Sequence, residues 1–265
     1  MTVVIPVWGA RYVASLERAI ASVRAQDADV PIIVADNASE VEVPEISGTT
    51  VVRSPRRLSV GEARNLGLER VETEYVVILD ADDELTAGAL TSLRAGIAAD
   101  PSIAVYAMSL LDADTGARHR TPRGFVPALT RARRLFALAT ATWSLYPIHG
   151  SAIMRTAWIR DAGGYIDRSG EDWVLAVSQA FRGRIVIDPR PAAIYHAHPD
   201  SLLRRSRGAA DLLAKAKRVR SRLAGDPAVP HWVRPLLPLI AILQTLLILV
   251  IRPLYQVWRE RREGT

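Results

Sequence analysis

Residues 75–83 read Tyr75-Val76-Val77-Ile78-Leu79-Asp80-Ala81-Asp82-Asp83, and this stretch predicts the fold more strongly than any other. Five β-prone residues run directly into three carboxylates, so a strand is expected to end at an acidic cluster. Carboxylates held this close favour a cation, and oxygen ligands suit hard divalent ions such as Mg²⁺ or Mn²⁺. The alternative for an isolated Asp-x-Asp is an ordinary turn or a helix cap, which Asp also favours.

Strand and helix patterns alternate through the first part of the chain. The predicted strands cover residues 3–7, 30–35, 50–53 and 75–79, and the predicted helices begin near residues 12, 60 and 86. Ser59 and Glu62 have the spacing of a capping box, which marks the start of the second helix. This alternation predicts an α/β domain with a mostly parallel sheet and helices on both faces. In such a sheet the strand ends lie along one edge.

The next region is less regular. Strands are expected at residues 103–110 and 148–154, and helices at residues 131–141, at residues 156–161 and from near Glu171. Residues 112–127 are polar and contain Gly and Pro, so they are interpreted as a loop.

The composition is that of a folded protein. Of 265 residues, 49% are hydrophobic and 23% are charged, which suits one large α/β domain with an appendage. The chain has no cysteine, and this excludes disulfides, thiolate metal sites and a cysteine nucleophile. A strand-like run begins already at Thr2, so no signal peptide is expected.

The positive charge is concentrated near the C-terminus. Residues 204–265 hold 13 Lys and Arg against 4 Asp and Glu, so this part carries +9 and residues 1–203 carry −3 of the total +6. We therefore divide the chain into a domain at 1–203 and a basic, helical tail at 204–265. A basic tail beside an apolar segment indicates an anionic membrane surface as a partner, and not nucleic acid.

The apolar segment of the tail covers residues 236–251. Its 16 residues fall just short of the ~17–25 that cross a bilayer. Basic residues flank it on both sides, and a single crossing would violate the positive-inside bias on one of them. We expect a peripheral or re-entrant segment at the cytoplasmic face of the cell membrane. The alternative is a helix that covers a hydrophobic groove or the seam of a homo-oligomer.

Four groups of residues follow predicted strands or begin a predicted helix. They are Pro6-Val7-Trp8-Gly9, Asp36-Asn37-Ala38-Ser39, the acidic cluster at 80–83, and Glu171-Asp172-Trp173. Because strand ends converge at one edge of a parallel sheet, these groups can meet in one crevice. A metal ion held there would be well placed to bind a diphosphate, which indicates an enzyme acting on a nucleotide-linked substrate.

The order and spacing of the motifs resemble the inverting glycosyltransferases of family 2, which have the GT-A fold. The matching segments are residues 5–9, 34–39, 63–67, 79–83, 169–173 and 195–202, so the resemblance covers about residues 2–204. Two departures stand out: Gly9 replaces a frequent Asn, and residues 112–142 match no part of the pattern. The resemblance implies an α/β GT-A sheet flanked by helices, here followed by a helical, membrane-associated tail.

The resemblance further implies a nucleotide-sugar donor, with UDP as the expected nucleotide. Asp36 would accept hydrogen bonds from the base, Trp8 would pack on the base or ribose, and Asp80 would contact the ribose or a metal-bound water. The residues expected to line the donor site are Pro6, Trp8, Asp36, Arg57, Arg64, Asn65, Asp80 and Ala81. The alternative for Trp8 is core packing, and for Asp36 it is a turn or a helix cap.

A divalent metal, Mn²⁺ or Mg²⁺, is implied in the same way, with Asp82 and His198 as its ligands. His196 lies two residues from His198 and would point to the same side of a strand, so the pattern separates the two histidines poorly. Asp83 is expected to cap the helix that begins near residue 86.

The candidate general base is Asp172, with Glu171 as a supporting residue. An inverting transfer is one displacement, in which a carboxylate takes the proton of an acceptor hydroxyl on a saccharide or lipid-linked saccharide. The alternative for this pair is a solvated helix N-terminus, where acidic residues are common.

Other functions are weighed against this one. A GT-A-like nucleotidyltransferase should have a Gly-rich signature and a Lys after its first strand, and Trp8-Gly9-Ala10-Arg11 has neither. A non-catalytic nucleotide-sugar-binding membrane module would not require Asp82 and Asp172. A dinucleotide-dependent dehydrogenase is not expected, because the chain has no Gly-x-Gly-x-x-Gly.

Overall fold

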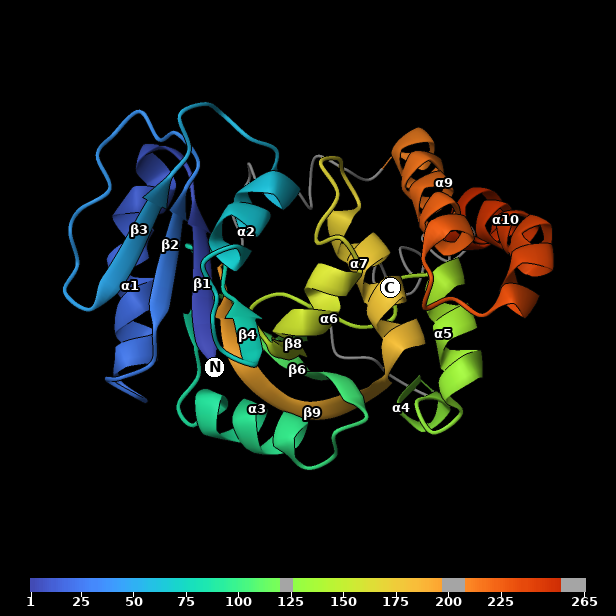
Figure 1. Cartoon of the computed structure of the whole chain (residues 1–265), viewed down its shortest axis with the longest axis horizontal. Coiled ribbons are helices and arrows are strands. Elements are labelled where there is room, and N and C mark those ends of the chain that lie inside the picture. The colour runs from blue at the N-terminus through green and yellow to red at the C-terminus, as the bar shows by residue number, and fades with distance from the viewer. Residues whose placement is uncertain (120–125, 197–207, 254–265) are drawn as a thin grey trace, which may run out of the picture.

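The computed structural model describes residues 1–119, 126–196 and 208–253, which form a nine-stranded sheet flanked by helices (Figure 1). The strands are β1 (Thr2–Val7), β2 (Ile32–Asp36), β3 (Thr49–Arg53), β4 (Tyr75–Ile78), β5 (Glu84–Leu85), β6 (Ile103–Asp112), β7 (Arg118–His119), β8 (Ala152–Arg155) and β9 (Arg184–Tyr195). The helices are α1 (Gly9–Arg24), α2 (Val60–Leu68), α3 (Ala89–Ala98), α4 (Val126–Leu129), α5 (Arg133–Thr142), α6 (Thr156–Asp161), α7 (Glu171–Arg182), α9 (Ala209–Gly225) and α10 (Leu237–Leu246). The strand order is β3-β2-β1-β4-β8-β6-β9-β5, and β7 pairs with β6.

The N-terminal strands are parallel, as the alternating pattern predicts. β1 pairs with β2 on one side and with β4 on the other, and β3 continues the sheet beyond β2. Strands β1, β2 and β4 are almost entirely buried because helices cover both faces of this half. Their C-terminal ends therefore lie at one edge of the sheet.

The other half of the sheet is mixed. β8 runs antiparallel to both β4 and β6, and β5 runs antiparallel to β9, whereas β9 is parallel to β6. The prediction of a mostly parallel sheet is thus correct for β1 to β4 and is corrected for the remainder.

The sequence patterns do not predict β9 or β5. Pro189 and Pro191 interrupt the strand signal of β9, and the pairing with β6 shifts register on both sides of Ser109, which lies opposite Pro191. Proline lacks the N–H that a ladder requires, so β9 accommodates it at such irregularities. β5 contains only two residues, which are too few for a local pattern to predict. It forms a strand because it pairs with β9, which is distant in the sequence.

The predicted role of Asp83 as a helix cap is wrong. Helix α3 begins at Ala89 rather than near residue 86, and its N-cap is Gly88 without a side-chain cap. The carboxylate of Asp83 is buried and accepts a hydrogen bond from the backbone N–H of His196, at 3.2 Å. Asp83 therefore fastens the acidic motif to the end of β9.

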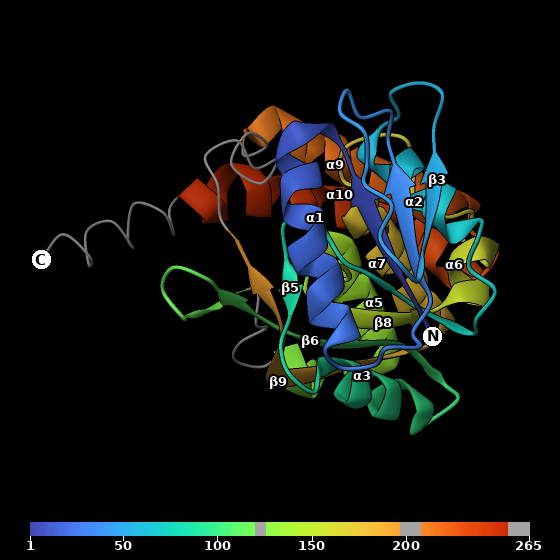
Figure 2. The same cartoon turned by 90° about the vertical axis from the view of Figure 1, so that its left-hand side faces the viewer.

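Two hydrophobic clusters cover the two faces of the sheet. Helices α1 and α3 pack on one face, around Leu16, Ile20 and Leu93. Helices α5, α7 and α9 build the cluster on the other face, as Figures 1 and 2 show from two directions. Because α9 contributes Ala216, Val219 and Leu223 to this cluster, the basic helix is part of the folded body. The predicted boundary at residue 203 lies outside the described residues.

The apolar C-terminal segment forms one helical rod, His231–Ile251, that is long and apolar enough to cross a membrane. Only 17% of its most apolar window is buried. Ile240, Gln244 and Ile248 recur at helical spacing and pack inward, and the amide of Gln244 donates to the carbonyl of Ala141 at 2.8 Å. One face of the rod is therefore fixed to the protein and the other face is exposed.

Helix α2 lies unusually close to β1. The predicted capping box is confirmed, because Ser59 accepts from the N–H of Glu62 and the Glu62 carboxylate accepts from the N–H of Ser59. At the other end of the helix, a Cβ on Gly67 would lie 2.3 Å from Cγ1 of Val4 in the core of β1. The glycine thus permits the close packing that sets the position of Arg64 one turn earlier.

We expect Gly67→Ala to destabilise the protein by about 1–3 kcal/mol, because the added methyl group overpacks a buried interface. Gly225→Ala is the matched control, since nothing lies within 4 Å of its Cβ position, and its stability should stay within about 1 kcal/mol of the parent. Urea denaturation measures both. Equal midpoints for the two variants would show that α2 has room to move away from β1.

Candidate functional site

The carboxyl ends of β2, β1 and β4 bring the predicted site residues to one edge. Asp36 closes β2 in register with Val7 of β1, and Asp80 follows β4 on the other side of β1. Neighbouring strands lie about 4.8 Å apart, so Asp36 and Asp80 are separated by roughly 10 Å across β1. This distance suits two ends of one extended ligand. Pro6 lies in β1 between them.

Asp36 is almost completely buried, with 1% of its surface exposed, and both of its oxygens have partners. Oδ1 accepts from the N–H of Ser39 at 2.9 Å, and Oδ2 accepts from the guanidinium of Arg53 at 2.8 Å. Arg53 is paired with Asp36 in the register of β2 and β3, and it also donates to the carbonyl of Ser39. This arrangement neutralises the buried charge and fixes the loop after β2.

Trp8 is not a core residue, because 40% of its surface is exposed. The guanidinium carbon of Arg57 lies 3.0 Å from the centroid of the indole ring, so the two side chains stack. Burial lowers the pKa of Arg57, although Glu40 opposes this effect. The pair forms a flat, partly exposed platform at the end of β1.

The acidic motif places its side chains differently. Ala81 is buried, whereas Asp80 and Asp82 are half-buried. Burial raises the pKa of the Tyr12 hydroxyl in α1, and the charges of Asp82 and Asp80 raise it further, so both carboxylates lie near this ring. The backbone carbonyl of Asp82 accepts from Arg18, at 3.1 Å. The two carboxylates thus remain at this edge of the sheet while the backbone near them is fixed.

Arg64 joins the acidic motif to helix α7. Its guanidinium is buried and contacts two carboxylates, Asp80 Oδ1 at 3.1 Å and Glu171 Oε1 at 2.8 Å. Although burial works against the charged form, Asp80 and Glu171 raise the pKa of Arg64, so it stays a cation. Arg64 and Glu171, which are 107 positions apart in the sequence, are therefore held side by side, a contact that the sequence analysis does not predict.

Glu171 and Asp172 form the first turn of α7, where Gly170 is the N-cap. Burial raises the pKa of the Glu171 carboxyl; Arg64 lowers it, and Asp172 raises it further. Asp172 is half-buried, and its carboxylate accepts from the N–H of Trp173 at 2.7 Å. Its second oxygen has no hydrogen bond to the described residues, which leaves it able to accept a proton from a ligand.

Tyr165 lies beneath this group. Burial raises the pKa of its hydroxyl, Arg64 opposes the rise, and the charges of Glu171, Asp80 and Asp172 add to it. The hydroxyl is 3.1 Å from Nε2 of His149, another buried side chain. Asp80, Glu171 and Asp172 therefore share one neighbourhood.

Asn65 fixes this neighbourhood from α2. Its amide donates to the carbonyl of Tyr165 at 2.8 Å and accepts from the N–H of the same residue at 2.9 Å. The sequence analysis predicts that Asn65 lines the donor site. In the structure its side-chain amide binds the backbone of Tyr165.

The predicted metal ligands are only partly described. Asp82 is at the crevice, but His198 lies outside the described residues. His196 contacts Glu84 through Nε2 at 2.8 Å, and Glu84 also pairs with Arg18 at 3.0 Å. Within residues 1–119, 126–196 and 208–253, no three His, Asp or Glu side chains gather as a metal-binding set.

Several residues of the site are missed by sequence reasoning. They are Tyr12, Arg53, His149 and Tyr165. Arg53 had a detectable signal, because it ends a predicted strand next to the strand that ends at Asp36. The other three come from helices or loops whose approach depends on tertiary packing.

Comparison with known proteins identifies the family of this chain. Residues 2–163 match the family described as Glycosyl transferase family 2. Over 207 residues the chain is 25% identical to the succinoglycan biosynthesis protein ExoO of Rhizobium meliloti (strain 1021). The match covers 72% of this chain and 59% of ExoO, so the chain spans about three fifths of that relative.

Solved structures share the fold at low identity. TarS 1–349 of S. aureus in complex with UDP-GlcNAc superposes with a TM-score of 0.65 at 16% identity, covering 85% of this chain and 67% of the TarS 1–349 chain. The mannosyltransferase PcManGT of Pyrobaculum calidifontis, in complex with GDP-Man and Mn²⁺, gives 0.61 at 20% identity and covers 94% of this chain and 70% of its own. Because the family match spans more than half of the chain and these structures share its architecture, the chain belongs to glycosyl transferase family 2 and has the predicted GT-A fold.

Proposed function

We propose that the protein is a metal-dependent, inverting glycosyltransferase. It moves a sugar from a nucleotide-sugar donor, with a UDP-sugar as the expected class, to a hydroxyl of a saccharide or lipid-linked saccharide. The observation that carries this proposal is the contact of Arg64 with both Asp80 and Glu171, because it unites the donor edge of the sheet with the helix that bears Asp172. A screen of nucleotide sugars for release of the nucleoside diphosphate tests it, and no release with any donor would contradict it.

The donor end of the crevice fits a nucleoside. Asp36 retains lone pairs that can accept from a base, and the stacked pair of Trp8 and Arg57 offers a flat surface for a base or ribose. Pro6 and Ala81 line the same edge through their strand and turn positions. TarS, which shares the fold, is seen with UDP-GlcNAc, and this supports a nucleotide-sugar donor here.

The residues present fit a hard divalent ion. Asp82 and Asp80 are half-buried carboxylates at the same edge, and a bound diphosphate would supply further oxygens. We propose Asp82 and His198 as the protein ligands of Mn²⁺ or Mg²⁺, which PcManGT is also seen to bind as Mn²⁺. Such an ion neutralises negative charge on the leaving diphosphate.

Arg64 and Asn65 contribute by positioning. The guanidinium of Arg64 is committed to Asp80 and Glu171, and the amide of Asn65 is committed to Tyr165. We therefore propose that both residues act on the donor indirectly. Arg64 does so through the carboxylates of Asp80 and Glu171, and Glu171 is thereby fixed beside the proposed general base. Asn65 does so through the loop that contains Tyr165.

Asp172 serves as the general base. Its carboxylate takes the proton of the acceptor hydroxyl while the hydroxyl oxygen bonds to the anomeric carbon and the bond from that carbon to the diphosphate oxygen breaks. Inversion follows, because the acceptor attacks the face opposite the leaving group. The N–H of Trp173 donates to one oxygen of Asp172 at 2.7 Å and holds this carboxylate in place.

The C-terminal rod fits a membrane surface. Its outer face exposes Leu239, Ile242, Leu243, Leu246, Leu249, Val250 and Ile251. Because Gln244 and its neighbours bind the inner face to the protein, we propose that the rod lies in the plane of the cytoplasmic leaflet and does not cross it. Basic residues of the tail would face anionic lipid. An acceptor attached to the membrane would then be within reach, and ExoO is named for polysaccharide synthesis.

Asp82→Ala should reduce donor-dependent turnover at least about a hundredfold, because loss of a metal ligand removes several kcal/mol of charge stabilisation. Released nucleoside diphosphate is measured across a Mn²⁺ titration. Asp114→Ala, which removes an exposed carboxylate elsewhere, should keep full activity. Full activity of Asp82→Ala at all Mn²⁺ concentrations would refute the metal assignment.

Asp172→Asn should lower kcat about 10²- to 10⁴-fold with little change in donor affinity, because the amide cannot accept the proton. Steady-state rates give kcat, and calorimetric titration with the donor diphosphate gives binding. Asp114→Asn is the control for the loss of one charge. An unchanged kcat would exclude Asp172 as the base.

Leu246→Glu combined with Leu249→Glu should weaken binding to vesicles of phosphatidylglycerol and phosphatidylcholine at least about tenfold, because two exposed leucines that would enter the lipid are replaced by charges that anionic lipid repels. Co-sedimentation measures the bound fraction. Val41→Glu with Val51→Glu makes the same change at exposed positions remote from the rod and should bind normally. If both double variants sediment like the parent, the rod is not the membrane contact.

A further inference from the structure

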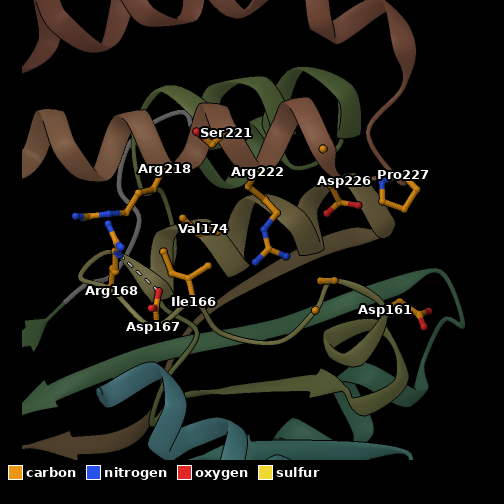
Figure 3. A pocket seen from close by; sticks show the side chains of 13 residues that line it. Asp161, Ile166, Asp167, Arg168, Val174, Arg218, Ser221, Arg222, Asp226 and Pro227 are labelled. Carbon is orange, nitrogen blue, oxygen red and sulfur yellow. Dashed lines mark ion pairs between the residues drawn. The ribbon is translucent and has the colours of Figure 1, made fainter. Parts of the chain in front are cut away.

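A cavity of about 540 Å³ lies away from the donor crevice, between α9 and the segment that joins α6 to α7 (Figure 3). Its volume falls within the range of small-molecule sites, which is roughly 300–1,000 Å³. Val174 of α7 lines it, two residues after Asp172. Two residues turn a helix by roughly 200°, so the cavity and the general base lie on opposite sides of α7.

Three arginines line this cavity: Arg168, Arg218 and Arg222 (Figure 3). Arg222 is half-buried, and its guanidinium makes no hydrogen bond or ion pair to any residue that the structure describes. Arg218 donates to the backbone carbonyl of Ser169 at 2.7 Å and pairs with no described carboxylate. Arg168 approaches Asp167 at 3.8 Å, and both of these side chains are exposed. The arginines are therefore poorly compensated.

The acidic residues of the cavity do not cancel this charge. Asp226 gives both of its oxygens to Arg182, at 2.7 and 2.9 Å, in a buried pair. Asp161 is exposed and lies at the end of the cavity remote from Arg168 and Arg218 (Figure 3). Burial lowers the pKa of Arg222, and Asp226 offsets this only in part because Arg182 opposes it. The side of the cavity near Arg218 and Arg222 thus carries surplus positive charge.

The remaining wall is apolar. Ile166 and Val174 form one side, and Ala162 and Pro227 lie toward the other end. Guanidinium groups beside an apolar wall suit an anion that carries an apolar group, and Arg binds phosphate through paired N–H donors.

We propose that this cavity binds a phosphoryl group borne on an apolar organic moiety, with Arg222 and Arg218 as its principal contacts. The ligand is either a soluble organic phosphate or the phosphate of a lipid headgroup; the chemistry of recognition is the same. The site is separate from the proposed donor crevice and does not depend on the proposed transfer reaction.

Calorimetric titration of the full chain with hexyl phosphate tests the site, with inorganic phosphate and hexanol as probes of the two halves of the ligand. Hexyl phosphate should bind more tightly than either. Arg222→Gln should weaken its binding about tenfold, because a charge-assisted hydrogen bond is lost, and Arg222→Lys should weaken it less. Lys217→Gln is the matched control: the same charge is removed from an exposed position of the same helix, and binding should change less than about twofold.

A second variant tests the site independently, in case Arg222→Gln does not fold. Ser221 is exposed and lines the cavity, so Ser221→Glu adds a repelling charge at a tolerant position and should also abolish binding. Flotation with phosphatidylcholine vesicles, with and without phosphatidic acid, distinguishes the source of the phosphate. A lipid headgroup is indicated if vesicles with phosphatidic acid bind Lys217→Gln better than Arg222→Gln. A soluble phosphate is indicated if the two variants differ only in their affinity for hexyl phosphate. Equal behaviour of Arg222→Gln and Lys217→Gln toward both probes would overturn the proposal.

Discussion

The contact of one buried guanidinium with two carboxylates organises this protein. Arg64 reaches Asp80 at the end of β4 and Glu171 at the start of α7, elements that no local interaction would bring together. Removing charged groups from water is costly unless each is paired. This ion-pair group therefore fixes the position of α7 relative to β4 more than it adds stability. Two carboxylates against one cation leave a residual negative charge, and Asp172 adds to it. A site with this imbalance favours a positive ion. Burial raises the pKa of Glu171, and the charge of Asp172 raises it further.

The mixed topology of the sheet makes that contact possible. In the parallel half, the ends of β2, β1 and β4 present Asp36 and Asp80 at one edge. The antiparallel β8 then returns the chain across the sheet, so α6 and α7 cover the face next to this edge. β9 finally runs beneath β6 and ends beside the acidic motif, where Asp83 and Glu84 hold His196 (Figure 1). The candidate site is thus built from the strand ends of the first half of the chain and from α7 and β9 of the second half.

Sequence patterns predict the first half well because its signals are local. Buried β-prone runs define β1, β2 and β4, and the Ser59 capping box fixes the start of α2. Prediction fails where pairing partners are distant. Pro189 and Pro191 conceal β9, and the two residues of β5 form a strand only because β9 is there. The same limit applies within the site: the motif predicts that Asp80 and Glu171 converge, but the partnership of Arg53 with Asp36 and of Tyr165 with His149 depends on packing between elements.

Helix α9 connects the two regions for which separate roles are proposed. On one side Arg218 holds the carbonyl of Ser169, and the side chain of Lys215 lies over Gly170, where a Cβ would approach it to 2.7 Å. Gly170 has a φ of 90°, so both its backbone and the overlying lysine require glycine at the residue that precedes Glu171 and Asp172. On the other side Arg220 donates to Gln244 of the apolar rod. If the rod lies on a bilayer as proposed, α9 connects that contact to the residues that precede Glu171 and Asp172. The proposed general base and the proposed membrane contact are then supported by the same helix, which packs into the main core although its basic sequence sets it apart.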